Sequence, residues 1–280
     1  MNSDKLKHMI SKKSNGNQIV TLNLFQMFYF ERLLERISKS KYSGQIILKG
    51  GLLLSSIIGS DERTTKDMDT TLKGIPLTKE IIEKIFIEIL NIDLNDGVSF
   101  EIISIKDIRL EDEYSGFRIN ILSKLDNNKT YITVELTTGD VITPKEVKYS
   151  YNCIFENKKI PIMAYPIETV LAEKFQTIIS RGILNTRLKD FFDIHVLMNT
   201  KINNKTLIKA IINTFNKRNT LFDINEFYII INELEESKEM NKLWIEYQNK
   251  NRYAEDIKYI DTIKSIEKII KLLENELITI

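Results

Sequence analysis

The amino-acid sequence predicts an α/β protein whose second half is helical, and three observations support that prediction. Segments with strand-like alternation of apolar and polar residues gather between residues 98 and 138. Helix-like spacing takes over near Tyr165 and dominates the rest of the chain. No internal repeat or low-complexity linker interrupts either half. We therefore expect an α/β domain over residues 1–163 and a helical domain over residues 164–280.

The first part of the chain predicts helices and short strands in turn. Residues 22–39 place apolar side chains at helical spacing, and "QIILKGG" indicates a short buried strand that ends in a glycine turn. "LLLSSIIG" then predicts a buried helix, residues 67–72 predict a strand, and "LTKEIIEKIFIEILNI" predicts an amphipathic helix capped by Thr78. The apolar stripe of the first helix comprises Leu22, Phe25, Phe28 or Tyr29, Leu33 and Ile37.

Strands and then helices fill the middle of the chain. "VSFEIISIKDIRL", "SGFRINILSKL" and "KTYITVELTTG" predict three strands, and the turn "DNNK" joins the last two in a hairpin. Shorter strands are expected around residues 148–155 and 159–162. "YPIETVLAEKFQTIISRG" and "NTRLKDFFDIHVLMNT" predict two helices separated by Gly182.

Composition restricts the classes of site and of partner. The net charge of +1 gives no global attraction for nucleic acid, although 40 Lys and Arg residues allow a local basic patch. Cys153 is the single cysteine and there are two histidines, which excludes a disulfide framework and cysteine-based or histidine-rich metal sites. A bound metal must therefore have oxygen ligands, as Mg²⁺ or Mn²⁺ does. The sequence has no secretory signal and no apolar run approaching ~20 residues, so we expect a cytoplasmic protein with no membrane partner.

A pair of aspartates provides the first candidate for chemistry. Asp67 and Asp69 project from the same face of a predicted strand, while Met68 points into the core. Two neighbouring carboxylates repel unless a cation lies between them. Taken alone, the pair is more often two solvated acids at a strand end.

Glu135 could add a third carboxylate from another strand. It lies in "YITVELTTGD", on the face opposite to Ile132, Val134 and Leu136. A two-metal site for phosphoryl transfer usually needs such an acid. An exposed strand residue explains Glu135 equally well.

The glycine turn provides a candidate phosphate site. Gly50 and Gly51 open a helix at a strand end, where backbone N–H groups can approach a phosphate. A tight turn without a ligand fits equally well, because the segment matches neither a P-loop nor a dinucleotide fingerprint. Arg63, Thr65 and Lys66 could contact the same polyphosphate, although singly they resemble ordinary loop residues.

One lysine is placed where a charge is costly. Lys174 lies within the apolar stripe of Ile167, Val170, Leu171 and Ile178. It must either pair with an acid or phosphate or extend to the surface along its own methylene groups. Asp190 and Asp193 on the next helix are possible partners, with Arg187 and Lys189 beside them. Lys189 and Asp193 could also form a simple i, i+4 pair.

Together these segments resemble the AbiEii/AbiGii toxin family of the nucleotidyltransferase superfamily, over roughly residues 20–200. The resemblance rests on "LKGG", "RTTKDMD", "ITVELTTGDVITP", "YPIETVLAEKF" and "NTRLKDFFDI", in that order. It implies the nucleotidyltransferase fold, a mixed sheet with flanking helices followed by a C-terminal helical domain. The chain departs from the family pattern in having Gly51 where serine is usual, Thr65 for serine, and Glu135 where aspartate is more frequent.

The resemblance also implies an activity and a set of roles. It implies a metal-dependent toxin of a toxin–antitoxin or abortive phage infection system, which transfers NMP from an NTP to an acceptor, with tRNA the leading acceptor class. Mg²⁺ or Mn²⁺, the NTP and an antitoxin encoded nearby are the expected ligands and partner. The predicted site residues are Asp67, Asp69, Lys174 and Asp190 for catalysis; Gly50, Gly51, Arg63, Thr65, Lys66, Lys174 and Lys189 for the nucleotide; and Asp67, Asp69 and Glu135 for metal.

Two other readings of the sequence remain open. An NTP-binding regulatory module without catalysis would keep the same nucleotide site. A glycosyltransferase also uses Asp-x-Asp with a metal, but such folds generally place about a hundred residues before it, and only 66 precede Asp67. If the first reading is correct, we expect a cleft between the two halves, with metal on the sheet side and Lys174 and Asp190 facing it.

Overall fold

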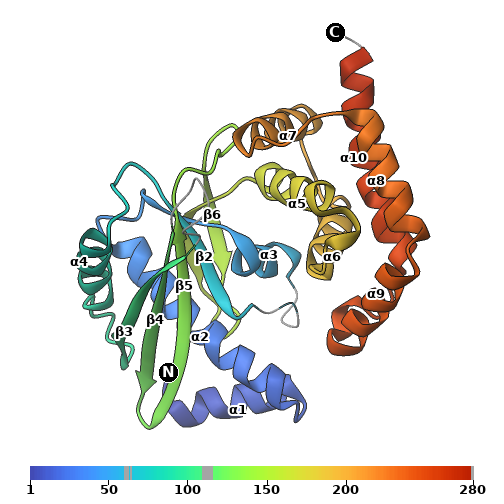
Figure 1. The fold of residues 1–280 in the computed structure, drawn as a ribbon. Coiled ribbons are helices and arrows are strands. Elements are labelled where there is room, and N and C mark those ends of the chain that lie inside the picture. The colour runs from blue at the N-terminus through green and yellow to red at the C-terminus, as the bar shows by residue number, and fades with distance from the viewer. Residues whose placement is uncertain (60–62, 64, 109–115, 279–280) are drawn as a thin grey trace. The chain divides into compact units, whose positions relative to one another are not determined.

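A mixed sheet forms the centre of the first half of the protein (Figure 1). The computed structural model describes residues 1–59, 63, 65–108 and 116–278. Within these residues, seven strands pair in the order β3-β4-β5-β2-β1-β7-β6. They are β1 Ile46–Leu48, β2 Asp67–Leu72, β3 Val98–Ile108, β4 Gly116–Leu125, β5 Asn128–Thr137, β6 Val147–Asn152 and β7 Lys159–Ala164.

Parallel and antiparallel pairs both occur in this sheet. β2 lies between β5, to which it is parallel, and β1, to which it is antiparallel. β3, β4 and β5 form an antiparallel meander, and β7 pairs with β1 in parallel. The nonlocal β2–β5 pairing places the Asp-x-Asp segment at the centre of the sheet.

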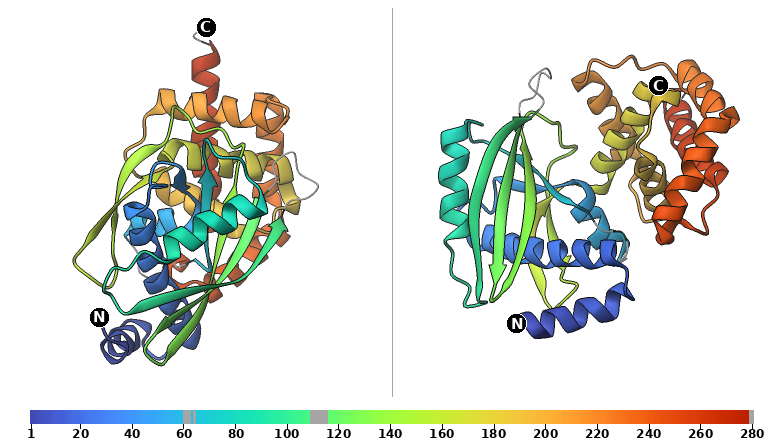
Figure 2. Two further views of the ribbon diagram at one scale, coloured as in Figure 1. Left: turned by 90° about the vertical axis from the view of Figure 1, so that its left-hand side faces the viewer. Right: turned by 60° about the horizontal axis from the view of Figure 1, so that its bottom comes forward.

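Helices lie on both faces of the sheet. They are α1 Ser3–Ser14, α2 Gln18–Lys39, α3 Gly50–Ile58 and α4 Lys79–Leu90. α2 packs on β5 and β7 and α4 packs on β3, whereas α3 lies on the other side, against β2 (Figures 1 and 2). The alternating residues of the strands explain this layering, because Ile119, Ile121, Ile132 and Val134 are fully buried while their strand neighbours are more exposed.

Two features of the N-terminal helices differ from the sequence prediction. α1 was not expected, because its segment is short and mostly polar, and Leu6 and Ile10 are its buried apolar residues. Leu22 was assigned to the apolar stripe of α2 but is exposed, whereas Leu24 and Met27 are buried. The rest of the predicted stripe is confirmed from Phe28 onward, since Phe28, Tyr29, Leu33 and Ile37 are buried, and α2 is buried on all sides over residues 27–37.

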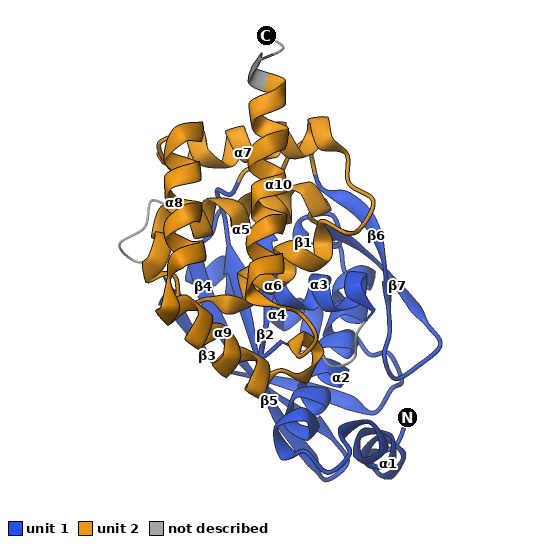
Figure 3. Cartoon of the chain, turned by 90° about the vertical axis from the view of Figure 1, so that its right-hand side faces the viewer, with its two compact units in different colours: residues 1–140, 146–164 blue, residues 141–145, 165–280 orange. Residues whose placement is uncertain are grey.

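The helical half forms a second compact unit (Figure 3). It contains α5 Ile167–Arg181, α6 Leu188–Leu197, α7 Asn204–Lys217, α8 Ile224–Glu236, α9 Lys238–Lys250 and α10 Tyr259–Ile278, with short turns η1 Gly182–Leu184 and η2 Arg252–Ala254. Its core includes a cluster of aromatic rings from Phe175, Phe215 and Phe227. None of the described helices is both long and apolar enough to cross a membrane.

A short segment after β5 belongs to this helical unit. The first unit comprises residues 1–140 and 146–164, and the second comprises residues 141–145 and 165–280. Thr143 explains the exception, because its backbone N–H donates to Thr169 Oγ1 at 3.0 Å and its hydroxyl accepts from Asn213 Nδ2 at 2.9 Å.

Candidate active site

The two aspartates of β2 share one face of the sheet. Met68 between them is fully buried on the opposite face, as the alternation of the strand requires. Thr65 is buried just before the strand, and its Oγ1 donates to Asp67 Oδ1 at 2.8 Å. The hydroxyl therefore orients the first carboxylate, which explains why a hydroxyl residue precedes the acids.

The two glycines provide the space that these side chains occupy. Gly50 begins α3 with φ +62°, and a Cβ added there would stand 1.9 Å from Asp69 Oδ2. A Cβ on Gly51 would stand 2.6 Å from Thr65 Oγ1. The start of α3 is therefore packed directly against both side chains, and its first N–H groups lie beside the Asp-x-Asp segment.

Glu135 lies beside Asp69 across the β2–β5 pair. The register places Asp69 opposite Glu135 and Asp67 opposite Thr133. Arg118 of β4 donates from Nε and Nη2 to Glu135 Oε1 at 3.0 and 2.6 Å. The hydrogen bond and charge of Glu135, with a smaller contribution from Asp67, raise the pKa of Arg118 above its ordinary value. Sequence reasoning did not select Arg118, although its alternation with buried Phe117 and Ile119 places it on the polar face.

Lys174 is the centre of a separate ionic cluster in the helical unit. Its Nζ lies 2.6 Å from Asp190 Oδ1 and 2.8 Å from Asp193 Oδ2, and its side chain is only 12% exposed. Arg187 Nε adds a contact of 3.0 Å to Asp190 Oδ2. Burial opposes the charge on Lys174, but Asp193 and Asp190 outweigh it, and the pKa of Lys174 is raised. Pairing, and not extension to the surface, explains this lysine, whereas Lys189 is exposed.

Comparison with known proteins identifies the family. The family model described as nucleotidyl transferase AbiEii toxin, type IV toxin–antitoxin system, matches residues 32–269. The chain belongs to the AbiEii nucleotidyltransferase toxin family. A search of curated protein sequences gave no match. This AbiEii-family protein is accordingly a nucleotidyltransferase and the toxin of a type IV toxin–antitoxin system, which confirms the predicted family and enzyme class.

Solved structures show the same fold at low sequence identity. MenT4, a nucleotidyltransferase toxin from Mycobacterium tuberculosis H37Rv, is 13% identical with a TM-score of 0.56, covering 74% of this chain and 68% of MenT4. A protein from H. pylori assigned as a nucleotidyltransferase is also 13% identical, with a TM-score of 0.50 over 90% of this chain and 96% of its own. The predicted nucleotidyltransferase fold is therefore confirmed.

Two further cations of the AbiEii-family toxin lie close to the glycine turn. Arg63 is buried, and its Nη1 lies 3.7 Å from where a Cβ on Gly51 would stand. Lys49, the residue before the glycines, donates from Nζ to Asp140 Oδ2 at 2.5 Å and to Thr137 Oγ1 at 2.9 Å. Its backbone N–H also donates to Asp69 O at 3.0 Å, so Lys49 fixes the turn to β2 and β5.

Sequence reasoning missed Lys49, although its position between a buried strand and a glycine pair was a signal. A long charged side chain at that point must find partners within the fold. Lys66, which was predicted to contact the nucleotide, is exposed.

The acids fit a hard divalent cation by their chemistry. Asp67 and Asp69 offer carboxylate oxygens on a common face, and oxygen ligands suit Mg²⁺ and Mn²⁺. Among the described residues, no three His, Cys, Asp or Glu side chains are gathered closely enough to hold a metal. Glu135 is engaged by Arg118 in this arrangement, and its part in a metal site stays a prediction.

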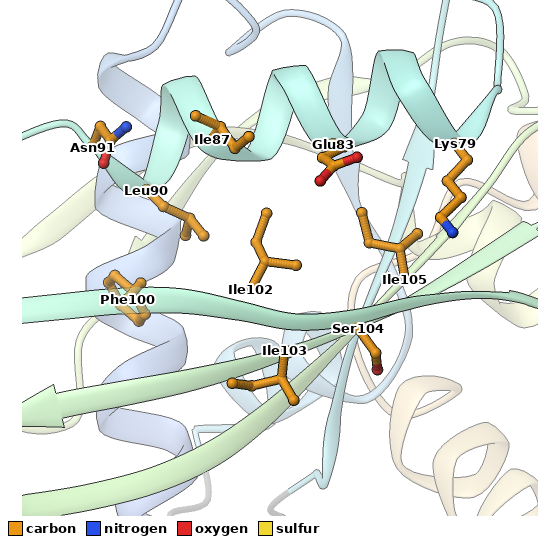
Figure 4. Close-up of a pocket in the computed structure, with 10 residues that line it drawn as sticks. All are labelled: Lys79, Glu83, Ile87, Leu90, Asn91, Phe100, Ile102, Ile103, Ser104 and Ile105. Atoms are coloured by element: carbon orange, nitrogen blue, oxygen red, sulfur yellow. The ribbon is translucent and has the colours of Figure 1, made fainter.

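A groove on the opposite face of the sheet is separate from these acids (Figure 4). It has a volume of about 490 Å³ and lies between α4 and the edge strand β3. Its walls combine apolar residues of α4 and β3 with Lys79, Glu83 and Asn91 from α4 and its end and Ser104 from β3. Phe100 and Ile102 line it from the face of β3 that α4 covers. It is therefore no part of the candidate site.

Proposed function

We propose that this toxin transfers a nucleoside monophosphate from an NTP to an RNA acceptor, tRNA, with a divalent metal held by Asp67 and Asp69. The observation that supports this most directly is the contact between the start of α3 and the acids. Gly50 and Gly51 have no side chains, so backbone N–H groups and carboxylates can face the same polyphosphate.

The chain's own groups suit an NTP. The triphosphate would lie at the N-terminus of α3, where N–H groups and the helix dipole favour anions. Arg63, buried beside Gly51, adds positive charge. Lys66 lies on the exposed approach to β2 and would contact the outer phosphates.

A bound Mg²⁺ or Mn²⁺ would supply Lewis-acid stabilisation of the reacting phosphate oxygens, with Asp67 and Asp69 as ligands and Glu135 as a third. Thr65 would hold Asp67 in its orientation through the hydrogen bond described above. The acceptor hydroxyl oxygen attacks the α-phosphorus in line, the bond from that phosphorus to the bridging oxygen breaks, and pyrophosphate leaves. The hydroxyl proton passes to solvent.

Lys174 and Asp190 form the second part of the proposed site. The two buried carboxylates keep Lys174 charged and its side chain fixed, which suits a lysine that contacts a phosphate. Lys189, exposed on the same helix as Asp190, would contribute a peripheral contact. We propose that Lys174 and Asp190 act on the same nucleotide as the acids of β2.

Membership of a toxin family supports a proposal for the biological setting. We propose that an antitoxin encoded nearby counteracts the toxin in the cytoplasm, and that the pair acts in abortive phage infection. Growth of cells that express the chain with and without the neighbouring gene tests this setting independently of the chemistry.

The decisive experiment is incubation with α-labelled NTPs and total cellular RNA. Labelled RNA supports the proposal; binding of NTP without labelling supports the regulatory module, and use of a sugar nucleotide supports a glycosyltransferase. Asp67→Asn or Asp69→Asn should abolish labelling and growth inhibition, with an unchanged or higher melting temperature because carboxylate repulsion is relieved.

Asp107→Asn provides a matched control, because Asp107 is an exposed aspartate of the same sheet on β3. This variant should label RNA as the wild type does. Full labelling by either Asp67→Asn or Asp69→Asn would exclude the proposed metal site.

A further inference from the structure

One face of the β3–β4–β5 meander is covered by helices and the other is polar. Along most of β4 and β5, more buried and more accessible residues alternate, and the more buried set lies on the side of α2 and α4; the alternation ends at Gly116–Phe117 and Leu136–Thr137, where both neighbours are buried. The accessible set continues onto β3. We call this surface the open face, and define it by Lys106, Arg118, Asn120, Lys129, Tyr131 and Thr133.

The open face is continuous with the candidate active site. Thr133 is paired with Asp67 across β5 and β2, and Glu135 with Asp69. Tyr131 is two residues before Thr133 on the same strand face, roughly 7 Å along the strand. A ligand lying on this face would therefore lead directly to the Asp-x-Asp segment.

Tyr131 is an aromatic residue presented to solvent on a polar surface. Its side chain is 64% exposed, whereas its backbone oxygen accepts a hydrogen bond from Gln26 Nε2 at 3.1 Å. The strand is thus anchored while the ring remains accessible. Half-buried Leu122 lies opposite it on β4. Exposed aromatic rings on a sheet are the platforms on which unpaired bases stack.

Charge and hydrogen-bonding groups surround the ring. Glu101 pairs with Lys124 at 2.8 Å, and Glu135 pairs with Arg118, so these four charges cancel in pairs. Lys106 and Lys129 then give the open face an excess of positive charge. Thr133 Oγ1 donates to Asn120 Oδ1 at 3.1 Å, and Asn120 in turn donates to Ser104 Oγ at 2.9 Å. These hydrogen bonds hold polar side chains in place on β5, β4 and β3, and Thr133 among them is the cross-strand neighbour of Asp67.

The character of the face favours nucleic acid over protein. A protein interface is built around an apolar, charge-depleted core, whereas here Tyr131 and half-buried Leu122 stand among polar and charged groups. Duplex RNA is recognised chiefly by its backbone shape, so an exposed aromatic ring has no base to stack on it. An unpaired strand offers both phosphates for the lysines and bases for the ring.

We propose that the open face binds the single-stranded 3′ end of the acceptor RNA and directs its terminal hydroxyl to the Asp67–Asp69 site. Tyr131 stacks on a base, and Lys106 and Lys129 bind the phosphates on either side. This inference rests on the proposed transfer to RNA, and it adds the surface that receives the acceptor.

The test measures binding of a fluorescent single-stranded oligoribonucleotide to the full chain by anisotropy, without NTP. Tyr131→Ala should weaken binding by about tenfold or more, as loss of one stacked base predicts, whereas Tyr131→Phe should stay within about twofold. Lys106→Gln with Lys129→Gln should weaken binding and reduce its salt dependence. Lys84→Gln, an exposed lysine of α4 on the other side of the sheet, is the matched control and should bind as the wild type does.

Three further measurements separate this inference from the proposed function. NTP binding by calorimetry should be unchanged in Tyr131→Ala, and Tyr131→Thr, a good strand former, checks that any loss is not caused by misfolding. If wild-type protein labels no RNA with NTP, the proposed function fails. If it labels RNA and Tyr131→Ala binds and labels equally well, only the open face is wrong.

Other occupants of the face also have defined outcomes. Equal affinity for a blunt duplex, displacement of the oligonucleotide by NTP alone, or a dimer that Tyr131→Ala separates would each overturn the inference.

Discussion

Gly50→Ala isolates the contact between the glycine turn and Asp69. An alanine at φ +62° costs about 1–2 kcal/mol, because the left-handed region brings Cβ close to the following carbonyl. Its Cβ would also stand 1.9 Å from Asp69 Oδ2 and 2.6 Å from Asp69 Cβ, and relieving such a clash costs a further ~1–3 kcal/mol. We expect the free energy of unfolding to fall by about 2–5 kcal/mol in total.

Gly59→Ala is the matched control at the other end of α3. Its φ is +72°, but a Cβ there meets no atom within 4 Å, so only the backbone cost of about 1–2 kcal/mol applies. Urea unfolding followed by circular dichroism gives both free energies, and RNA labelling at a temperature where both variants are folded gives their activities. Gly59→Ala should keep its activity and Gly50→Ala should lose it, because Asp69 or the start of α3 must move.

Equal losses of stability in the two variants, with full activity in Gly50→Ala, would refute the reasoning. The helix start would then not be packed on Asp69 in solution.

Three further predictions concern two buried ionisable groups, Lys174 and Glu31. Lys174→Met leaves Asp190 and Asp193 buried without their ammonium partner, so thermal or urea unfolding should show a loss of about 3–5 kcal/mol, and no loss would contradict the ion cluster. Because the pKa of Lys174 is raised on folding, its stabilisation is fully present below about pH 10.4 and is lost as pH rises through the raised value, a loss that the methionine variant should lack. Burial raises the pKa of Glu31 to about 8, against a smaller opposing effect of the Ile154 N–H. Wild-type stability should therefore fall from about pH 4.3 to 8, and Glu31→Gln should flatten that part of the unfolding profile; an unchanged profile would contradict the assignment.

The strand alternation of the acids could be read from sequence because it depends only on local geometry. Asp67 and Asp69 project together because strand residues two apart share a face, and Met68 is buried for the same reason. By the same rule, Glu135 projects from one face of its strand, and Ile132 and Val134 project from the other. The rule gave no information on which strand would lie beside β5.

The partners of the charged residues depended on contacts distant in sequence. From the sequence, Lys174 could either pair with an acid or extend to the surface. The packing of α5 on α6 brings Asp190 and Asp193 to its ammonium group, so Lys174 is paired. Arg118 binds Glu135 only because β4 and β5 pair in that register. The division into an α/β domain over residues 1–163 and a helical domain over residues 164–280, and the cleft between them, stay predictions.

The sequence by itself determined the family, the order of most helices and strands, and the face of each strand that carries acids, because these follow from local periodicity and motif order. Only the tertiary structure showed that the side chains of Asp69 and Thr65 occupy the positions that Cβ atoms on Gly50 and Gly51 would need. It also brought Glu135 beside Asp69 through the parallel pairing of β2 and β5. The physical reason is that register and close packing are set by contacts between segments far apart in the chain, which the local pattern of side chains does not specify.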